Sequence, residues 1–111
     1  MNIDAITNRL NKFAEDRDWS SFLSPKNIAI ALAVEVGELL EIFQWLPENV
    51  DCVHDQKIRH KTTEEIADIF IYAIMLSNKM NININEAVFA KMNKNEEKYP
   101  IDKVKGSLNK L

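Results

Sequence analysis

Apolar residues recur at steps of three and four along most of the chain, which is the period of an α-helix. The first such stretch predicts an amphipathic helix over residues 3–16. The second follows Ser24 and Pro25, which supply an N-cap and a proline at the first helical position. It is predicted to run to Leu46, because Pro47 stops it.

A third stretch, residues 63–80, is apolar around most of its circumference and predicts a central helix that neighbouring helices bury. The break that follows it ends at Asn85, which is predicted to cap a fourth helix up to Lys98. The polar residues 48–61 form a connector or the first turns of the third helix, and residues 101–111 form a loose tail.

Composition supports one helical domain over residues 1–111. The chain has 111 residues, of which 46% are hydrophobic and 28% charged, and only 2 glycines and 3 prolines interrupt it. So few breakers favour a few long helices over a many-turned sandwich or barrel, and no repeat or linker divides the chain. The fold class is therefore predicted to be all-α.

The helices predicted over residues 25–46 and 63–80 are too apolar to be covered by two short amphipathic helices of the same chain. We therefore expect a four-helix-type bundle that oligomerisation completes. A homodimer, or a tetramer built as a dimer of dimers, is the simplest arrangement.

Charge and cysteine content limit the partners and the compartment. The formal net charge of −3 gives no global positive field for a nucleic-acid backbone, so no nucleic-acid partner is expected. The longest apolar run, residues 69–76, is too short to span a bilayer, and the first residues lack a signal-peptide pattern. The single cysteine, Cys52, excludes an internal disulfide, and a cytoplasmic location is predicted.

The chemistry of the chain concentrates in two carboxylate pairs. Glu35 and Glu38 lie about 60° apart on the helical wheel, and Glu41 lies about another 60° round. Glu65 and Asp68 repeat the spacing on the third helix. Because like charges repel and the surrounding residues offer no cation, something outside the chain has to neutralise these acids.

Acids facing one another across a helix pair would make an all-oxygen site, which suits Mg²⁺ or Mn²⁺ rather than zinc. A di-iron bundle would need Glu-x-x-His, and no histidine follows either pair at that step. The alternative is that the acids form the solvated edge of two amphipathic helices. Either pair alone favours this alternative, whereas both pairs in otherwise apolar helices favour the metal site.

The chain resembles a known family over nearly its whole length, from Phe13 to Pro100. The segments that carry the resemblance are FAEDRDWSSFLSPKNIAIALAVEVGELLEIFQW, EEIADIFIY and KMNKNEEKYP. Together they resemble the MazG-like nucleoside triphosphate pyrophosphohydrolases, in particular the small single-domain dCTP-pyrophosphatase and integron-associated branch.

The resemblance implies a helical bundle that assembles as a dimer or tetramer, and a role in nucleotide-pool housecleaning. It also implies Mg²⁺-dependent cleavage of nucleoside triphosphates, dCTP or other deoxynucleotides first, to the monophosphate and pyrophosphate. The magnesium ligands it implies are Glu35, Glu38, Glu65 and Asp68. Leu23 is a departure, because related dCTP pyrophosphatases often carry histidine at that position.

Residues of the fourth helix are candidates for holding the phosphates. Lys91 and Asn95 match family positions that contact them, and Lys94 lies on the same helical face at steps of three and four. The alternative is a solvated basic face.

Aromatic residues are candidates for a nucleobase pocket, because a flat ring stacks on any base. For Trp19, Trp45 and Tyr72 the family resemblance favours this pocket, with Asn27 as an added polar contact. Aromatic residues at helix ends are more often core, and Phe22 is expected to be one of these.

The predicted reaction is in-line attack of an activated water on the α-phosphorus, with Glu38 or Glu41 as the base. An all-α dUTPase and a phosphoribosyl-ATP pyrophosphohydrolase are the nearest enzymatic alternatives. A non-catalytic helical module, whose acidic stripes bind a basic partner, is the alternative from another class.

Overall fold

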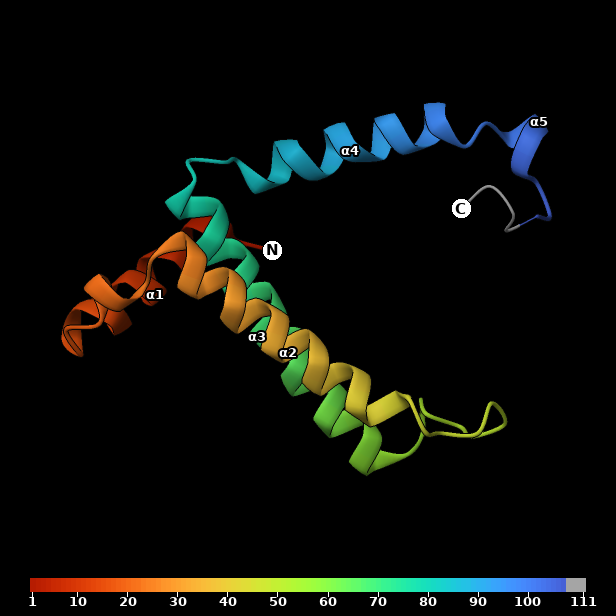
Figure 1. The fold of residues 1–111 in the computed structure, drawn as a ribbon, viewed down its shortest axis with the longest axis horizontal. Coiled ribbons are helices and arrows are strands. Elements are labelled where there is room, and N and C mark those ends of the chain that lie inside the picture. The colour runs from red at the N-terminus through yellow and green to blue at the C-terminus, as the bar shows by residue number, and fades with distance from the viewer. Residues whose placement is uncertain (108–111) are drawn as a thin grey trace. The chain divides into compact units, whose positions relative to one another are not determined.

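The structure is a computed structural model that describes residues 1–107, and every regular element in that range is helical (Figure 1). The chain divides into two compact units, Met1–Asn81 and Ile82–Leu111, which we describe one at a time. The prediction of an all-α fold is confirmed. None of the described helices combines the length and the apolarity that crossing a bilayer requires.

The first unit contains α1 (Ile3–Asp16), the short 3₁₀ helix η1 (Ser20–Phe22), α2 (Pro25–Phe43) and α3 (Gln56–Lys79). Helices α2 and α3 run side by side as an antiparallel hairpin, joined by residues 44–55, and α1 contacts α3 (Figure 1). Asn78 Nδ2 donates a hydrogen bond of 2.9 Å to Thr7 Oγ1, which fixes the end of α3 to α1.

Side-chain caps set where the helices of this unit begin. Ser24 Oγ accepts from the backbone N–H of Asn27 at 3.1 Å, and Pro25 follows as the first helical residue, as predicted. Asp55 Oδ1 accepts from the backbone N–H of Ile58 at 3.0 Å and starts α3 at Gln56. The third helix thus begins seven residues before the predicted residue 63, and α2 ends at Phe43 rather than at Leu46.

Few side chains are fully buried in the described part of the chain. Ala14, Ile28 and Ile74 form this small core, where α1, α2 and α3 each supply one residue. The expected core position of Phe22 is wrong: its side chain is 66% exposed, because η1 is a single turn at the surface.

Large apolar side chains remain exposed on both helices of the hairpin. On α2, the exposed fraction is 54% for Ile30, 55% for Val34 and 57% for Leu40. On α3, Ile66 and Phe70 are also exposed. The burial predicted for the third helix is therefore incomplete within one chain.

The second unit contains α4 (Ile84–Lys98) and the one-turn helix α5 (Ile101–Val104). Asn83 caps α4 by accepting from the backbone N–H of Glu86 at 3.1 Å, so the predicted cap at Asn85 is wrong by two residues. Helix α5 lies in the predicted loose tail, and residues 108–111 of that tail lie outside the described residues.

Candidate metal centre

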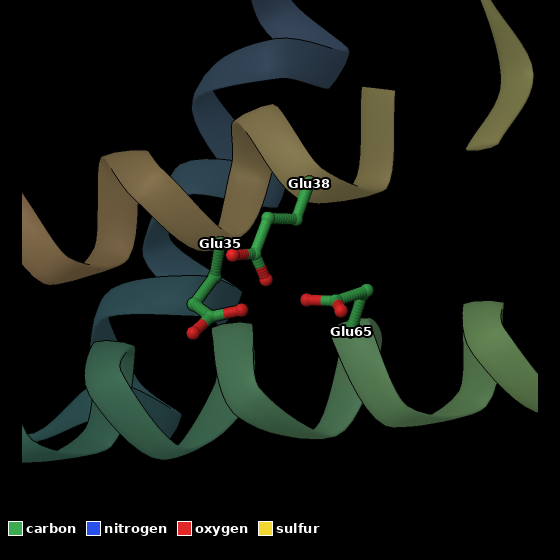
Figure 2. Close-up of side chains that lie close together, drawn as sticks. All are labelled: Glu35, Glu38 and Glu65. Atoms are coloured by element: carbon green, nitrogen blue, oxygen red, sulfur yellow. The ribbon is translucent and has the colours of Figure 1, made fainter. Parts of the chain in front are cut away.

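Three carboxylates meet between α2 and α3. Glu35 and Glu38 project from α2 and Glu65 from the facing side of α3, and their carboxyl groups point toward one another (Figure 2). One oxygen from each carboxylate lies within 4.8 Å of the other two. The three-residue spacing of Glu35 and Glu38 puts both on one face of α2, and the antiparallel pairing brings Glu65 opposite them.

The chain itself does not neutralise this carboxylate cluster. Glu35 and Glu65 are partly buried, and within the described residues Oε2 of each is shielded from solvent and has no hydrogen-bond partner. A buried, ionised carboxylate oxygen without a donor is costly. The cluster therefore offers carboxylate oxygens that could hold a cation.

The titration of Glu35 reflects this crowding. The Glu65 carboxyl, through a side-chain hydrogen bond that requires a shared proton, raises the pKa of Glu35 to about 7. Burial is the next cause, followed by the neighbouring carboxylate of Glu38 and the charge of Asp68. The neighbouring carboxyl groups and burial thus favour the protonated form of Glu35 over its charged form.

Asp68 and Tyr72 extend the site along α3. Asp68 is partly buried and stands outside the three-carboxylate cluster, but its charge acts on both Glu35 and Tyr72. Burial raises the pKa of the Tyr72 phenol, and the charges of Glu35 and Asp68 raise it further. All four predicted metal ligands therefore belong to one electrostatic neighbourhood, with Tyr72 beside it.

The donor set fits a hard divalent cation. The group that could hold a metal consists of carboxylates alone, with no histidine or cysteine among the described residues that compose it. Oxygen-only sites favour Mg²⁺, Mn²⁺ or Ca²⁺ over zinc, which takes nitrogen and sulfur ligands readily.

A hollow of about 520 Å³ opens beside the cluster, toward the C-terminal end of α2 and the N-terminal end of α3. The residues that line it are Glu38, Glu41, Ile42, Lys57, Ile58, Lys61, Glu64 and Glu65. Glu41, the second candidate base, therefore lies in the same hollow as Glu38. The sequence analysis missed Lys57 and Lys61, because it took residues 48–61 as a connector or as the first turns of the third helix and assigned them no site residue.

Two of the residues predicted to bind a nucleobase, Asn27 and Trp45, do not meet within one chain. Asn27 lies in the first turn of α2 and Trp45 follows its last turn, so a rise of 1.5 Å per residue separates them by about 24 Å or more. The Trp19 ring packs edge-on against Phe13, with ring centroids 5.7 Å apart. Trp45 is 84% exposed.

Asn27 also has a local role. Its side-chain Nδ2 donates a hydrogen bond of 2.9 Å to the backbone oxygen of Phe22, which ties η1 to the start of α2. The predicted phosphate-binding residues Lys91, Lys94 and Asn95 are exposed on α4 of the second unit, and their role stays a prediction.

Fold and site together define a class: an all-helical protein with a carboxylate cluster, which could hold a metal ion, between two antiparallel helices. A sequence profile described as the MazG-like family matches residues 30–110. The chain belongs to the MazG-like family, and the resemblance predicted from the sequence is confirmed.

Similar proteins agree with this assignment. The chain is 38% identical to dCTP pyrophosphatase 1 of Bos taurus over 98 residues, which is 86% of the chain and 58% of that protein. It is 35% identical to dCTP pyrophosphatase 1 of Homo sapiens over 101 residues, or 89% of the chain and 59% of the relative. The chain therefore spans less than two thirds of the length of these relatives.

A solved structure shares the fold. The crystal structure of a pyrophosphatase from Archaeoglobus fulgidus DSM 4304 matches with a TM-score of 0.78 and 38% sequence identity. The match covers 90% of this chain and 94% of the archaeal one.

Proposed function

We propose that this protein is a Mg²⁺-dependent nucleoside triphosphate pyrophosphohydrolase, in which Mn²⁺ can replace Mg²⁺. It cleaves deoxynucleoside triphosphates, dCTP first, to the monophosphate and pyrophosphate. The observation that carries the proposal is the cluster of Glu35, Glu38 and Glu65, in which the shielded Oε2 atoms of Glu35 and Glu65 have no hydrogen-bond partner among the described residues. The names of the similar dCTP pyrophosphatases and of the archaeal pyrophosphatase support the same chemistry.

In this proposal Glu35, Glu38, Glu65 and Asp68 hold the cation at the centre of the α2–α3 pair. A bound divalent cation supplies positive charge for phosphate oxygens and acidifies water. Glu38 or Glu41, both on the wall of the hollow, takes a proton from water as its oxygen bonds to the α-phosphorus. The bond from that phosphorus to the bridging oxygen breaks, and pyrophosphate leaves.

We further propose that the chain acts as a homo-oligomer, a dimer or a tetramer. Exposed fractions above one half for Ile30, Val34 and Leu40 leave an apolar face of α2 without cover. Trp19 and Trp45 lie at opposite ends of α2. A nucleobase pocket that uses both tryptophans therefore requires a second copy of the chain.

Pyrophosphate release from a panel of ribo- and deoxynucleoside triphosphates tests the proposed reaction. We expect turnover of deoxynucleotides in Mg²⁺ and none in EDTA. Preference for dUTP or for phosphoribosyl-ATP would instead support the enzymatic alternatives. No release from any nucleotide would contradict the proposal and support a helical interaction module.

A further inference from the structure

Two lysines line the acidic hollow without pairing to its acids. Lys57 and Lys61 share the hollow with Glu38, Glu41, Glu64 and Glu65, yet neither lysine forms an ion pair within the described residues. Glu64 is engaged elsewhere, because His60 Nε2 lies 3.2 Å from its Oε1. The two ammonium groups are therefore available to an anion that enters the hollow.

These lysines lie on the same face of α3 as the carboxylates of that helix. The steps from Lys57 to Lys61 to Glu65 are four residues each, so all three lie within a sector of about 80° on α3. Along the axis, Lys61 is about 6 Å and Lys57 about 12 Å before Glu65. Asp68 and Tyr72 continue this side of the helix in the opposite direction.

Helix stability does not explain the two lysines. Asp55 caps α3, so Lys57 lies in its first turn and Lys61 in its second. Backbone N–H groups make this end of a helix electropositive, which disfavours cations there. The same end favours an anion near both ammonium groups.

We propose that Lys57 and Lys61 bind the two outer phosphates of the substrate, the pair that leaves as pyrophosphate. The triphosphate then lies along α3 in one direction, with its outer end toward Lys57 and its nucleoside toward Tyr72. This inference rests on the proposed function. It assigns the contact to α3 of the first unit, whereas the candidates predicted from the sequence are Lys91, Lys94 and Asn95 of α4.

Pyrophosphate is the probe for this contact. In the double variant K57Q/K61Q, we expect the inhibition constant for pyrophosphate and the KM for dCTP each to rise about tenfold or more, since two charge-assisted contacts are lost. Calorimetric titration with pyrophosphate should show the same loss of affinity. Inhibition by dCMP should change less than about twofold, because the monophosphate lacks the outer phosphates.

Arg59→Gln is the matched control. It removes a positive charge from the same stretch of α3, but Arg59 lines a different hollow, with Phe43 and Val53. Pyrophosphate affinity in this variant should stay within about twofold of the wild type. The thermal midpoint of K57Q/K61Q should equal or exceed that of the wild type, because cations near the start of a helix do not stabilise it.

The outcomes separate the two proposals. If the wild type releases no pyrophosphate from any nucleotide, the proposed function fails. If the wild type is active but the affinity of K57Q/K61Q for pyrophosphate stays within about twofold of the wild type, only the present inference is wrong. Loss of pyrophosphate affinity in K91Q/K94Q with none in K57Q/K61Q would also overturn it. Should the double variant fail to fold, K57Q and K61Q are measured singly, and each should weaken pyrophosphate binding.

Discussion

At the scale of single residues, the site is governed by the crowding of acids around Glu35. The hydrogen bond to Glu65, burial and the neighbouring Glu38 together raise the pKa of Glu35 to about 7. A proton would therefore compete with the proposed divalent cation for the same oxygens. The acids could be found from the sequence because a three-residue step fixes their face of the helix, but the shared proton depends on the pairing of α2 with α3.

The metal-free protein should become less stable as pH rises from about 4.5 to about 7. In this window folded Glu35 keeps a proton that it loses in the unfolded chain, so raising the pH favours unfolding; above the window the effect levels off. The measurement is the difference in thermal midpoint between wild type and E35Q, in EDTA, at several pH values. A difference that is independent of pH would contradict the assignment.

Removing one ligand should abolish most of the activity without unfolding the protein. E38Q and D68N each keep the side-chain volume, and we expect turnover to fall by roughly two orders of magnitude or more. Circular dichroism should remain that of the wild type. E48Q, which changes an exposed acid in the connector, is the control. Wild-type rates in E38Q and D68N would refute the proposed ligand set.

At the scale of elements, the start of α3 decides what the hollow contains. Residues 56–62 are mostly polar and show no apolar stripe, so the periodicity alone could not decide between a connector and the first turns of the helix. The Asp55 cap, the hydrogen bond from Thr63 Oγ1 to Arg59 O and the pair of His60 with Glu64 stabilise the helix there. Sequence periodicity predicts elements with a continuous apolar face well, and cap-dependent extensions poorly.

The Asp55 cap of α3 should make a measurable contribution to the free energy of unfolding. D55A leaves the backbone N–H of Ile58 without its partner, and we expect the free energy of unfolding to fall by about 0.5–2 kcal/mol. D55N retains an accepting oxygen and should restore most of the loss. Urea denaturation of the three proteins measures both effects. Equal losses in D55A and D55N would show that the side-chain oxygen is not the cause.

At the scale of the whole molecule, one chain is too short to cover all the apolar surface of its helices. The composition was sufficient to predict the all-α class, since so few glycines and prolines favour long helices. The same reasoning anticipated helices that one chain does not cover, and Ile30 and Val34 are indeed more than half exposed. A nucleobase pocket could not be assembled from the sequence, because residue numbers give positions along one helix but not which side chains of other helices lie beside them.

A charge on the exposed face of α2 should weaken self-association. I30E places a carboxylate at a position that is 54% exposed in one chain, so the single chain should still fold. Sedimentation at micromolar concentration should show an oligomer for the wild type and smaller species for I30E. V53E, an exposed apolar position in the connector, serves as the control. A strictly monomeric wild type would contradict the oligomer.

With the proposed cation bound to them, the oxygens of Glu35 and Glu65 that lack a donor would also link folding to the ions in solution. An ion that binds only the native form stabilises it by mass action, in proportion to the logarithm of its concentration once the site is nearly saturated. The thermal midpoint of unfolding would then increase with the concentration of free Mg²⁺. The protein would be most durable under the same ionic conditions in which it can work.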